Sequence, residues 1–433
     1  MFPTALRARI SAAMPLALVL AVGSLPMAPL PADAARPPEA VRFATFNASL
    51  NRNGSGQALA DLSSPGNAQA SAVAEITQRT RPEVLLINEF DFEPDHALAT
   101  AFQDNYLSVP QAGDVAGIRY PHVYVAPSNT GIPSGMDFSN DGSVGGPNDA
   151  FGFGFFPGQF GMAVFSQHPI LTDEVRTFQK FLWKDMPGAL LPDDPATEAP
   201  ADWYSPAELG VFRLSSKSHW DVPISVGGTT VHFLVSHPTP PVFDDPPAFP
   251  AGVDFNGRRN FDEIRLWADY VTPGAGGYIY DDEGAFGGLR PGSKFVIAGD
   301  QNSDPLDGDS IPGSIQQLLD SPRINTTVTP SSVGGTGWSE EQAALNGFHD
   351  GDPAFDTADF CDTPAFPPCS GPGNLRADYV LPSRDLKITD AAVFWPEPGH
   401  PLVYLTGTGF PVPSSDHRLV WVDVRVPGSS RGG

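Results

Sequence analysis

The chain has 433 residues, with 50 acidic residues against 25 lysines and arginines, and its formal net charge is −25 at pH 7. A surface of that sign repels polyanions over a Debye length of about 8–10 Å, which disfavours tight, sequence-independent binding along a nucleic-acid groove. It does not exclude attack on a small phosphoester, because carboxylates also attract divalent cations. The 44 glycines and 47 prolines are interleaved with strand patterns, which indicates many ordered loops.

The first residues have the pattern of a secretory signal peptide. Arg7 and Arg9 precede an apolar run over residues 10–22, and Ala-Asp-Ala at 32–34 places small residues where signal peptidase cuts. A membrane anchor is the alternative, but glycine and proline interrupt the run, which is shorter than the roughly 20 residues of a spanning helix. We therefore expect residues 1–34 to be removed and the soluble product to be secreted, into the medium or the periplasm.

Strand patterns recur along the rest of the chain, each ending in polar or glycine-rich residues. In chain order they cover residues 41–47, 84–88, 162–166, 222–226, 230–236, 295–298, 378–381 and 419–426. Apolar residues at helical spacing cover residues 68–80 and 261–271. This alternation favours an α+β or α/β sandwich with the sheets inside and the helices outside.

No internal repeat and no long polar linker divides the chain after the signal peptide. We expect a short linker at 35–40, one catalytic domain over 41–427, a tail at 428–433, and a monomer. Four irregular stretches are interpreted as long loops that are functional or tied down, at residues 111–149, 172–208, 242–254 and 326–372.

The chain has only two cysteines, Cys361 and Cys369, which enclose a short proline-containing loop. In an oxidising compartment a disulfide between them is expected. A zinc site would require more cysteine or histidine ligands than the local sequence offers.

Polar residues follow several of the predicted buried strands, at the positions where a sheet presents catalytic groups. A single Asn, Glu or His after a strand is more often a turn or capping residue, so the set matters more than any member. The predicted site residues are Asn47, Glu89, His237, Asp300, Asn302, Asp378, Asp416 and His417.

Seven short motifs around these positions resemble those of the endonuclease/exonuclease/phosphatase superfamily, which has the deoxyribonuclease I-like fold. They are TFN at 45–47, NEF at 88–90, GMAVFSQHPI at 161–170, SHPT at 236–239, GDQNSD at 299–304, RADYVLPS at 376–383 and SDHRLV at 415–420. Each is weak alone, but their order is that of the family. The resemblance implies a four-layered α/β/β/α sandwich, with two mixed sheets flanked by helices and long loop insertions.

The resemblance also implies a metal site. Glu89, with help from Asn47, matches the principal ligand of Mg²⁺ or Mn²⁺, ions that prefer hard oxygen ligands. Asp416 matches a further carboxylate that is associated with the metal or supports the neighbouring histidine.

The remaining matches imply roles in proton transfer and positioning. Asp300 and Asn302 match the pair that positions the attacking water and a phosphate oxygen. His417 matches the catalytic histidine, which Asp378 would orient so that the imidazole acts as a general base. The histidine at position 237 is similar to that of pancreatic-type nucleases and sphingomyelinases, whereas family members that act on abasic sites usually have a different residue there. A second histidine in the site would stabilise charge or protonate the leaving oxygen.

These matches imply a secreted, metal-dependent phosphoester hydrolase, most simply a phosphodiesterase that is nuclease-like or cleaves phospholipid headgroups. A phosphomonoesterase acting on inositol or sugar phosphates is an alternative, so the substrate is a nucleic acid, a phospholipid headgroup or a small phosphate ester. A non-catalytic binding protein that retains the fold is a second alternative. Retention of Glu89 and His417 favours an enzyme, because a degenerate relative is expected to lose them.

Two further features lie outside these motifs. Asp137, Ser139 and Asp141 alternate before Gly142, as in an oxygen-rich calcium loop, although the terminal Glu of such a loop is absent; a structural Ca²⁺ site and a turn held by Asx side chains both remain open. Aromatic residues crowd a glycine-rich stretch at 151–158, which is interpreted as a loop near the mouth of the site.

Two groups of basic side chains have two interpretations each. Lys217 and His219 either face the site or lie at a solvated strand edge, and we favour the strand edge. Arg258 and Arg259, followed by Asn260, either meet phosphate at the start of a helix or are ordinary surface arginines.

Overall fold

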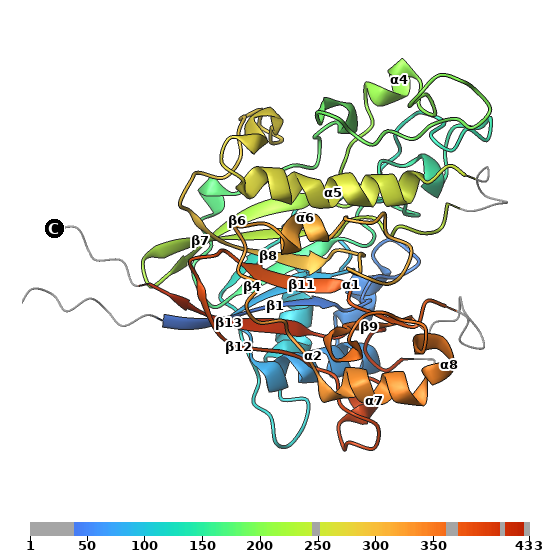
Figure 1. The fold of residues 1–433 in the computed structure, drawn as a ribbon. Coiled ribbons are helices and arrows are strands. Elements are labelled where there is room, and N and C mark those ends of the chain that lie inside the picture. The colour runs from blue at the N-terminus through green and yellow to red at the C-terminus, as the bar shows by residue number, and fades with distance from the viewer. Residues whose placement is uncertain (1–38, 245–251, 361–370, 408–411, 428–433) are drawn as a thin grey trace, which may run out of the picture. The chain divides into compact units, whose positions relative to one another are not determined.

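Two mixed sheets form the centre of the computed structural model of the chain (Figure 1). The first has the strand order β12-β13-β1-β2-β4-β3 and the second β11-β8-β7-β6-β5, and β9 pairs with β10 apart from both. The structure describes residues 39–244, 252–360, 371–407 and 412–427. The strands are β1 Glu39–Asn47, β2 Val84–Asn88, β3 His122–Tyr124, β4 Met162–Ser166, β5 Arg176–Thr177, β6 His219–Val226, β7 Thr229–Ser236, β8 Lys294–Asp300, β9 Ala358–Asp359, β10 Asn374–Leu375, β11 Asp378–Pro382, β12 Lys387–Val393 and β13 Val420–Val426.

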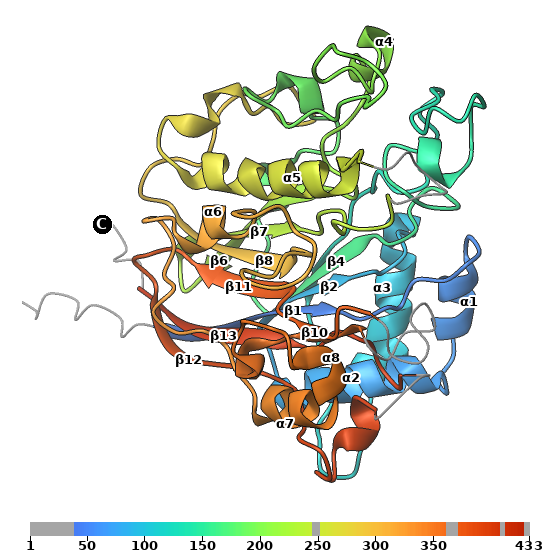
Figure 2. The ribbon, with the colours of Figure 1, turned by 45° about the vertical axis from the view of Figure 1, so that its right-hand side comes forward.

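Helices cover the outer face of each sheet. They are α1 Gln57–Leu62, α2 Ala68–Thr80, α3 Ala97–Phe102, α4 Pro206–Leu209, α5 Phe255–Val271, α6 Gln316–Leu319, α7 Val333–Glu341 and α8 Ala343–Asn346. In both ribbon views α5 lies on one side of the sheets and α2 on the other (Figures 1 and 2). None of the helices in the described ranges is long and apolar enough to cross a bilayer.

Strand alternation explains the layers. Phe43 of β1 faces the second sheet and packs against Phe233 of β7, with ring centroids 5.6 Å apart. The next apolar residues of β1, Ala44 and Phe46, face the other way and pack with α1, α2 and α3. On the far side Trp267 of α5 packs on the outer face of the second sheet. Successive side chains of one strand therefore pack into two different hydrophobic cores, because side chains along a strand alternate between the two faces of the sheet.

The α+β fold with two mixed sheets and flanking helices is confirmed. Helix α5 differs from the sequence prediction because it begins at Phe255 and not at residue 261. Its first turn contains Gly257, a weak helix former, but the Asp254 side chain accepts a hydrogen bond of 2.8 Å from the Gly257 amide. The Asp254 cap thus extends the helix over residues 255–260, whose helix propensity did not predict a helix. The predicted disulfide, Cys361 to Cys369, lies outside the described residues.

Candidate active site

The ends of two pairs of parallel strands meet at one edge of the sandwich. Strands β1 and β2 are parallel neighbours in one sheet, and β7 and β8 are parallel neighbours in the other. The Asn88 side chain connects them, because its oxygen accepts a hydrogen bond of 3.3 Å from the Asp300 amide and its nitrogen donates one of 3.5 Å to the Ser236 carbonyl. This contact brings the residues that follow all four strands into one space.

Asp300 lies at the centre of that space. Its Oδ2 accepts a hydrogen bond of 3.0 Å from Asn47 and lies 3.3 Å from Nε2 of His237 and 3.6 Å from Nε2 of His417. Its Oδ1 accepts a hydrogen bond of 2.9 Å from the Asn302 amide. Burial disfavours the carboxylate, but the two histidines outweigh burial and hold the pKa of Asp300 well below its usual range. Asp300 is therefore an anion at neutral pH.

His417 is held between two carboxylates. Its Nδ1 is 2.8 Å from Oδ2 of Asp378, which also accepts a hydrogen bond of 2.9 Å from the Thr357 hydroxyl. Burial alone would lower the pKa of His417, but Asp378 and Asp300 raise it well above its usual range. The ring is therefore an imidazolium at neutral pH before a substrate binds.

His237 has the opposite protonation state to His417. Burial and the nearby Lys217 lower the pKa of His237 to about 4, so its ring is neutral. Since Nε2 faces the anionic Asp300, Nε2 carries the proton and Nδ1 is a lone-pair acceptor, and Nδ1 is buried without a hydrogen-bond partner. The two histidines thus supply one proton donor and one proton acceptor, a separation that suits acid–base chemistry.

Glu89 presents a carboxylate suited to a cation. Its two oxygens accept only long hydrogen bonds, 3.2 Å from Asn47 and 3.3 Å from the Ser49 hydroxyl. Burial and the neighbouring Asp416 both raise the pKa of Glu89, so the bare site carries negative charge at a free-energy cost. Oxygens from Glu89, Asn47 and Asp416 match the preference of Mg²⁺ or Mn²⁺, and the residues fit the predicted metal.

A second acidic group, Asp300, Asp378 and His417, also has ligand atoms within 4.8 Å of one another. Both ring nitrogens of His417 already face carboxylates in this group. We interpret it as a proton-transfer network, because a metal there would displace the hydrogen bond between His417 and Asp378.

Two residues have left-handed backbone at this edge. Glu89 follows β2 with φ of 56° and Asn302 follows β8 with φ of 50°. Asparagine adopts this region readily, whereas glutamate does so rarely. The turn after β2 aims the Glu89 carboxylate into the site, and strain of this kind is characteristic of functional residues.

Lys217 faces the site, contrary to the interpretation that we favoured from the sequence. Its side chain is buried and lines the cavity, and its ammonium donates one long hydrogen bond of 3.4 Å to the Pro238 carbonyl. Burial lowers the pKa of Lys217, while Glu263, Glu89 and Asp300 act in the opposite direction. An ammonium with free donors beside Asp300 is placed to bind an anionic substrate.

His219 belongs to the core and not to the site. Its Nδ1 is 2.6 Å from the Ser215 hydroxyl, its Nε2 is 2.9 Å from the Glu263 carbonyl, and its ring packs against Trp267 at 5.2 Å between centroids. Burial lowers the pKa of His219 to about 4.

The buried His219 should make stability depend on pH. Below about pH 6.5 the unfolded chain binds a proton on this ring that the folded chain excludes until pH falls to about 4, so the folded state loses stability as pH falls through this window. The loss from His219 between about pH 7.5 and 5 is on the order of 2 kcal/mol. Urea unfolding at the two pH values measures it, and His219→Gln should show a smaller pH dependence. An equal dependence in both proteins would contradict the assignment.

Glu263 of α5 holds the loops that carry Lys217 and His237. One of its oxygens accepts hydrogen bonds of 2.6 Å and 3.0 Å from the amide and hydroxyl of Ser216, and the other accepts one of 2.7 Å from the Thr239 amide. Glu263 is fully buried. No sequence signal pointed to it, because a glutamate within a helix is ordinary and its partners lie 47 and 24 residues away.

Arg259 is neither at the first turn of a helix nor on the surface. It lies inside α5 and is buried, and its guanidinium donates to the carbonyls of Leu214, Phe151 and Arg213 at 2.8, 2.6 and 3.0 Å. The sequence interpretation as a surface arginine is therefore wrong, whereas contact with phosphate stays a prediction. The guanidinium also lies over the Phe212 ring, 4.8 Å from its centroid.

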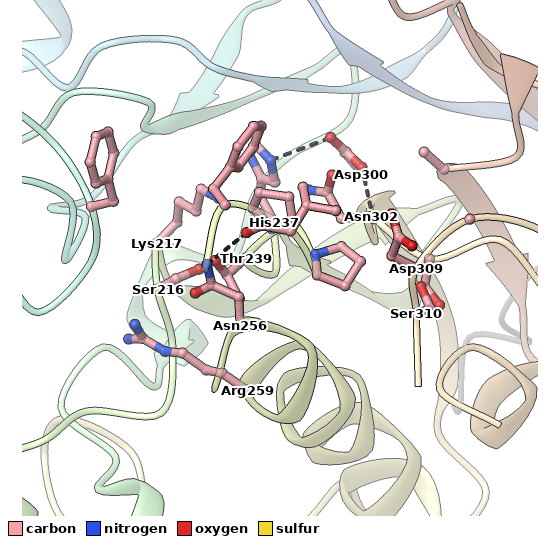
Figure 3. A pocket seen from close by; sticks show the side chains of 18 of the residues that line it. Ser216, Lys217, His237, Thr239, Asn256, Arg259, Asp300, Asn302, Asp309 and Ser310 are labelled. Atoms are coloured by element: carbon pink, nitrogen blue, oxygen red, sulfur yellow. Dashed lines mark hydrogen bonds and ion pairs between the residues drawn. The ribbon is translucent and has the colours of Figure 1, made fainter. Parts of the chain in front are cut away.

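Of the eight predicted site residues, all except Asn47 and Asp378 line one cavity of about 1320 Å³, together with Lys217 and Arg259. Figure 3 shows His237 near its centre, with Lys217 and Arg259 on one side in that view and Asp309 and Ser310 on the other. The aromatic stretch at 151–158 contributes Phe153, which agrees with a loop at the mouth of the site. Asn47 and Asp378 lie behind the lining and contact it through Asp300 and His417.

The predicted calcium loop is held by its own carboxylates. Asp137 accepts hydrogen bonds of 3.1 Å and 2.9 Å from the amides of Asp141 and Gly142, and its Oδ1 also accepts one of 3.5 Å from the Ser139 hydroxyl. Asp141 in turn accepts one of 2.8 Å from the Ser143 amide. These bonds are those of a turn held by Asx side chains. Calcium binding here stays a prediction.

Comparison with known proteins places this geometry in a family. Three solved structures are similar to this chain at low identity: an endonuclease/exonuclease/phosphatase from Beutenbergia cavernae (15% identity, TM-score 0.46, covering 92% of this chain and 74% of that one), sphingomyelinase C from Streptomyces griseocarneus (14%, 0.43, 89% and 99%) and truncated TDP2 from Caenorhabditis elegans (14%, 0.41, 89% and 98%). No curated protein matches. A sequence profile of the Endonuclease/Exonuclease/phosphatase family matches residues 44–417. The chain therefore belongs to this family of phosphoester hydrolases, whose members depend on divalent metal ions.

Proposed function

We propose that this protein is an exported phosphodiesterase that uses Mg²⁺ or Mn²⁺. The observation that carries the proposal is the contact of anionic Asp300 with two histidines of opposite protonation state, beside the Glu89 carboxylate. A structural role would not need two buried histidines with separated pKa values around one carboxylate. Export is supported by the signal-like residues at the start of the chain.

Each residue has a role in the proposed reaction. Asp300 accepts a hydrogen bond from the attacking water, and the Asn302 side chain, anchored by a 3.1 Å bond to the Pro238 carbonyl, fixes the position of its neighbours. His237 offers its unpaired Nδ1 as a proton acceptor or hydrogen-bond acceptor. His417, as an imidazolium, stabilises the charge of the phosphoryl group and supplies the proton that the leaving oxygen needs. This assignment differs from the general base expected from the sequence, because Asp378 and Asp300 keep His417 protonated.

The metal, held by Glu89 with Asn47 and Asp416, would supply Lewis-acid polarisation of a phosphoryl oxygen. Lys217 lines the same cavity and would bind the remaining negative charge of the phosphate. The metal and Lys217 would therefore surround the phosphate with positive charge in a protein whose net charge is negative.

Hydrolysis of bis(p-nitrophenyl) phosphate and p-nitrophenyl phosphate tests the proposal. Purified protein treated with EDTA is expected to lose turnover, and Mg²⁺ or Mn²⁺ to restore it, with the diester hydrolysed faster than the monoester. A faster monoester would favour the phosphomonoesterase instead. No turnover of either ester with either metal would leave the non-catalytic binding protein as the better description.

Lys217→Met is expected to lower kcat/KM for the diester by about 10- to 100-fold. The replacement keeps the unbranched side chain that fills the buried site but removes the charge, and one charged hydrogen bond to the phosphate is worth about 1.5–3 kcal/mol. Steady-state kinetics at saturating metal measure the change. Lys180→Met, which alters an exposed lysine, is the matched control. Equal kinetics for the two variants would remove Lys217 from the site.

A further inference from the structure

The cavity extends well beyond the space that a phosphate group needs. Its volume of about 1320 Å³ exceeds that of most pockets that enclose a whole drug-sized ligand. The polar residues of the reaction occupy one part of it. Beside Arg259 its wall is aromatic, because the guanidinium lies over the Phe212 ring and further rings from loops and from α5 line the cavity.

The aromatic wall is built around Phe212. Its ring centroid is 4.5 Å from that of Phe138 and 4.5 Å from that of Tyr204, and all three line the cavity. Phe153 lies at the mouth with 52% of its surface exposed and packs edge-on against Phe155 at 5.6 Å. Rings packed in this way offer faces and edges that pair well with another ring.

Two polar groups in this wall have unused donors. Tyr204 is 6% exposed and lines the cavity, and its hydroxyl has no hydrogen-bond partner among the described residues. Arg259 uses Nε and Nη2 on backbone carbonyls, whereas Nη1 has no hydrogen-bond partner in the same residues. Arg259 is 8% exposed. Both side chains line the cavity, so a ligand there can accept hydrogen bonds from them.

We propose that these five residues, Phe138, Phe153, Tyr204, Phe212 and Arg259, form an aromatic compartment that binds a planar ring in the alcohol part of the substrate. The ring carries hydrogen-bond acceptors on its edge, as a pyrimidine does, and its ester is a small molecule bound whole within the cavity. This inference rests on the proposed phosphodiesterase and names its substrate class.

An alkyl or acyl chain fits the compartment less well. Such a chain would gain contact with the rings, but it has no atom to accept from the Tyr204 hydroxyl or from Nη1 of Arg259, which it would cut off from solvent. A ring with acceptor edges uses both the apolar faces and the donors. The distinction separates nucleoside-like esters from lipid-like ones.

Three diesters with one leaving group test the inference. The p-nitrophenyl esters of methyl phosphate, hexyl phosphate and thymidine 5′-phosphate release the same phenolate, so differences in kcat/KM report the other alcohol. The thymidine ester is expected to exceed the methyl and hexyl esters by about tenfold or more, as burial of a ring worth about 1.5 kcal/mol implies. A hexyl ester equal to or better than the thymidine ester would overturn the proposal.

Two variants connect that preference to the compartment. Tyr204→Phe, which removes only the hydroxyl, and Phe153→Ala are each expected to lower the thymidine-to-methyl ratio of kcat/KM by about three- to tenfold. Phe286→Ala is the control, because Phe286 is exposed and does not line the cavity, and it should keep the ratio. An unchanged ratio in both compartment variants would overturn the assignment of these residues.

Calorimetry separates failure of this inference from failure of the proposed function. Thymidine 5′-monophosphate is expected to bind the metal-free protein about tenfold more tightly than inorganic phosphate does, and Tyr204→Phe to reduce that difference. If no ester is hydrolysed but thymidine 5′-monophosphate still binds more tightly, the result supports the aromatic compartment and contradicts the phosphodiesterase. If esters are hydrolysed but the two ligands bind equally, the result contradicts the aromatic compartment and not the phosphodiesterase.

Discussion

Replacing His417 with glutamine is expected to lower kcat for bis(p-nitrophenyl) phosphate by about a thousandfold. Glutamine fills similar space but cannot carry the proton or the positive charge that Asp300 and Asp378 maintain on the imidazole. General acid–base catalysis by one positioned group is worth about 10²–10⁴ in rate, and loss of the charge adds to it. Steady-state kinetics at saturating metal measure kcat, and the melting temperature shows whether the variant is folded.

His400→Gln is the matched control for this experiment. His400 is an exposed histidine that does not line the cavity, and its Nδ1 accepts a hydrogen bond of 3.1 Å from the Leu402 amide. Its replacement should leave kcat within about twofold, since surface substitutions rarely perturb the rest of the structure. A folded His417→Gln protein that retained the parent kcat would show that the proton comes from elsewhere.

Replacing Glu89 with glutamine is expected to have the second large effect, a loss of about a thousandfold or more in kcat/KM together with loss of metal-induced stabilisation. The parent should melt at a higher temperature in Mg²⁺ or Mn²⁺ than in EDTA, because a ligand that binds only the folded state stabilises it. Without the Glu89 charge this shift should shrink towards zero, while Glu174→Gln, an exposed glutamate on the surface, keeps it.

The same variant should be at least as stable as the parent in EDTA. Burial and Asp416 both oppose the charge of Glu89 when no cation is bound, so a neutral amide removes a repulsion from the empty site. A function that costs stability in this way is common at binding sites. Thermal melting in EDTA decides the point, and a Glu89→Gln protein that melted well below the parent would indicate a structural role instead.

The strand-end residues were predictable from sequence because each follows an uninterrupted buried strand. Asn47 and Asp300 are the last residues of β1 and β8, and Glu89 comes directly after β2; the period of two fixes which face each strand buries. Parallel neighbours then bring these positions together without any knowledge of side-chain contacts. The same reasoning located His237 after β7.

The supporting residues were not predictable, because their function comes from distant partners. Thr357 is an ordinary threonine in a loop, and only the fold places its hydroxyl 2.9 Å from Asp378. Lys217 and His219 are two positions apart, a spacing that would put them on one face of a strand, but β6 begins only at His219. Lys217 lies before that start, where its carbonyl accepts a hydrogen bond of 2.8 Å from the Asn129 amide, and its side chain is free to turn into the cavity.

The contrast between an acidic exterior and the buried cations Lys217 and Arg259 has a consequence for the rate of association. An anionic ester is repelled as it approaches a chain of net charge −25 and attracted only once it has entered the cavity. Dissolved salt screens exposed charges far more than buried ones. Rising ionic strength should therefore speed the encounter while leaving the lifetime of the complex nearly unchanged, the reverse of the behaviour of proteins that attract anions with a basic surface.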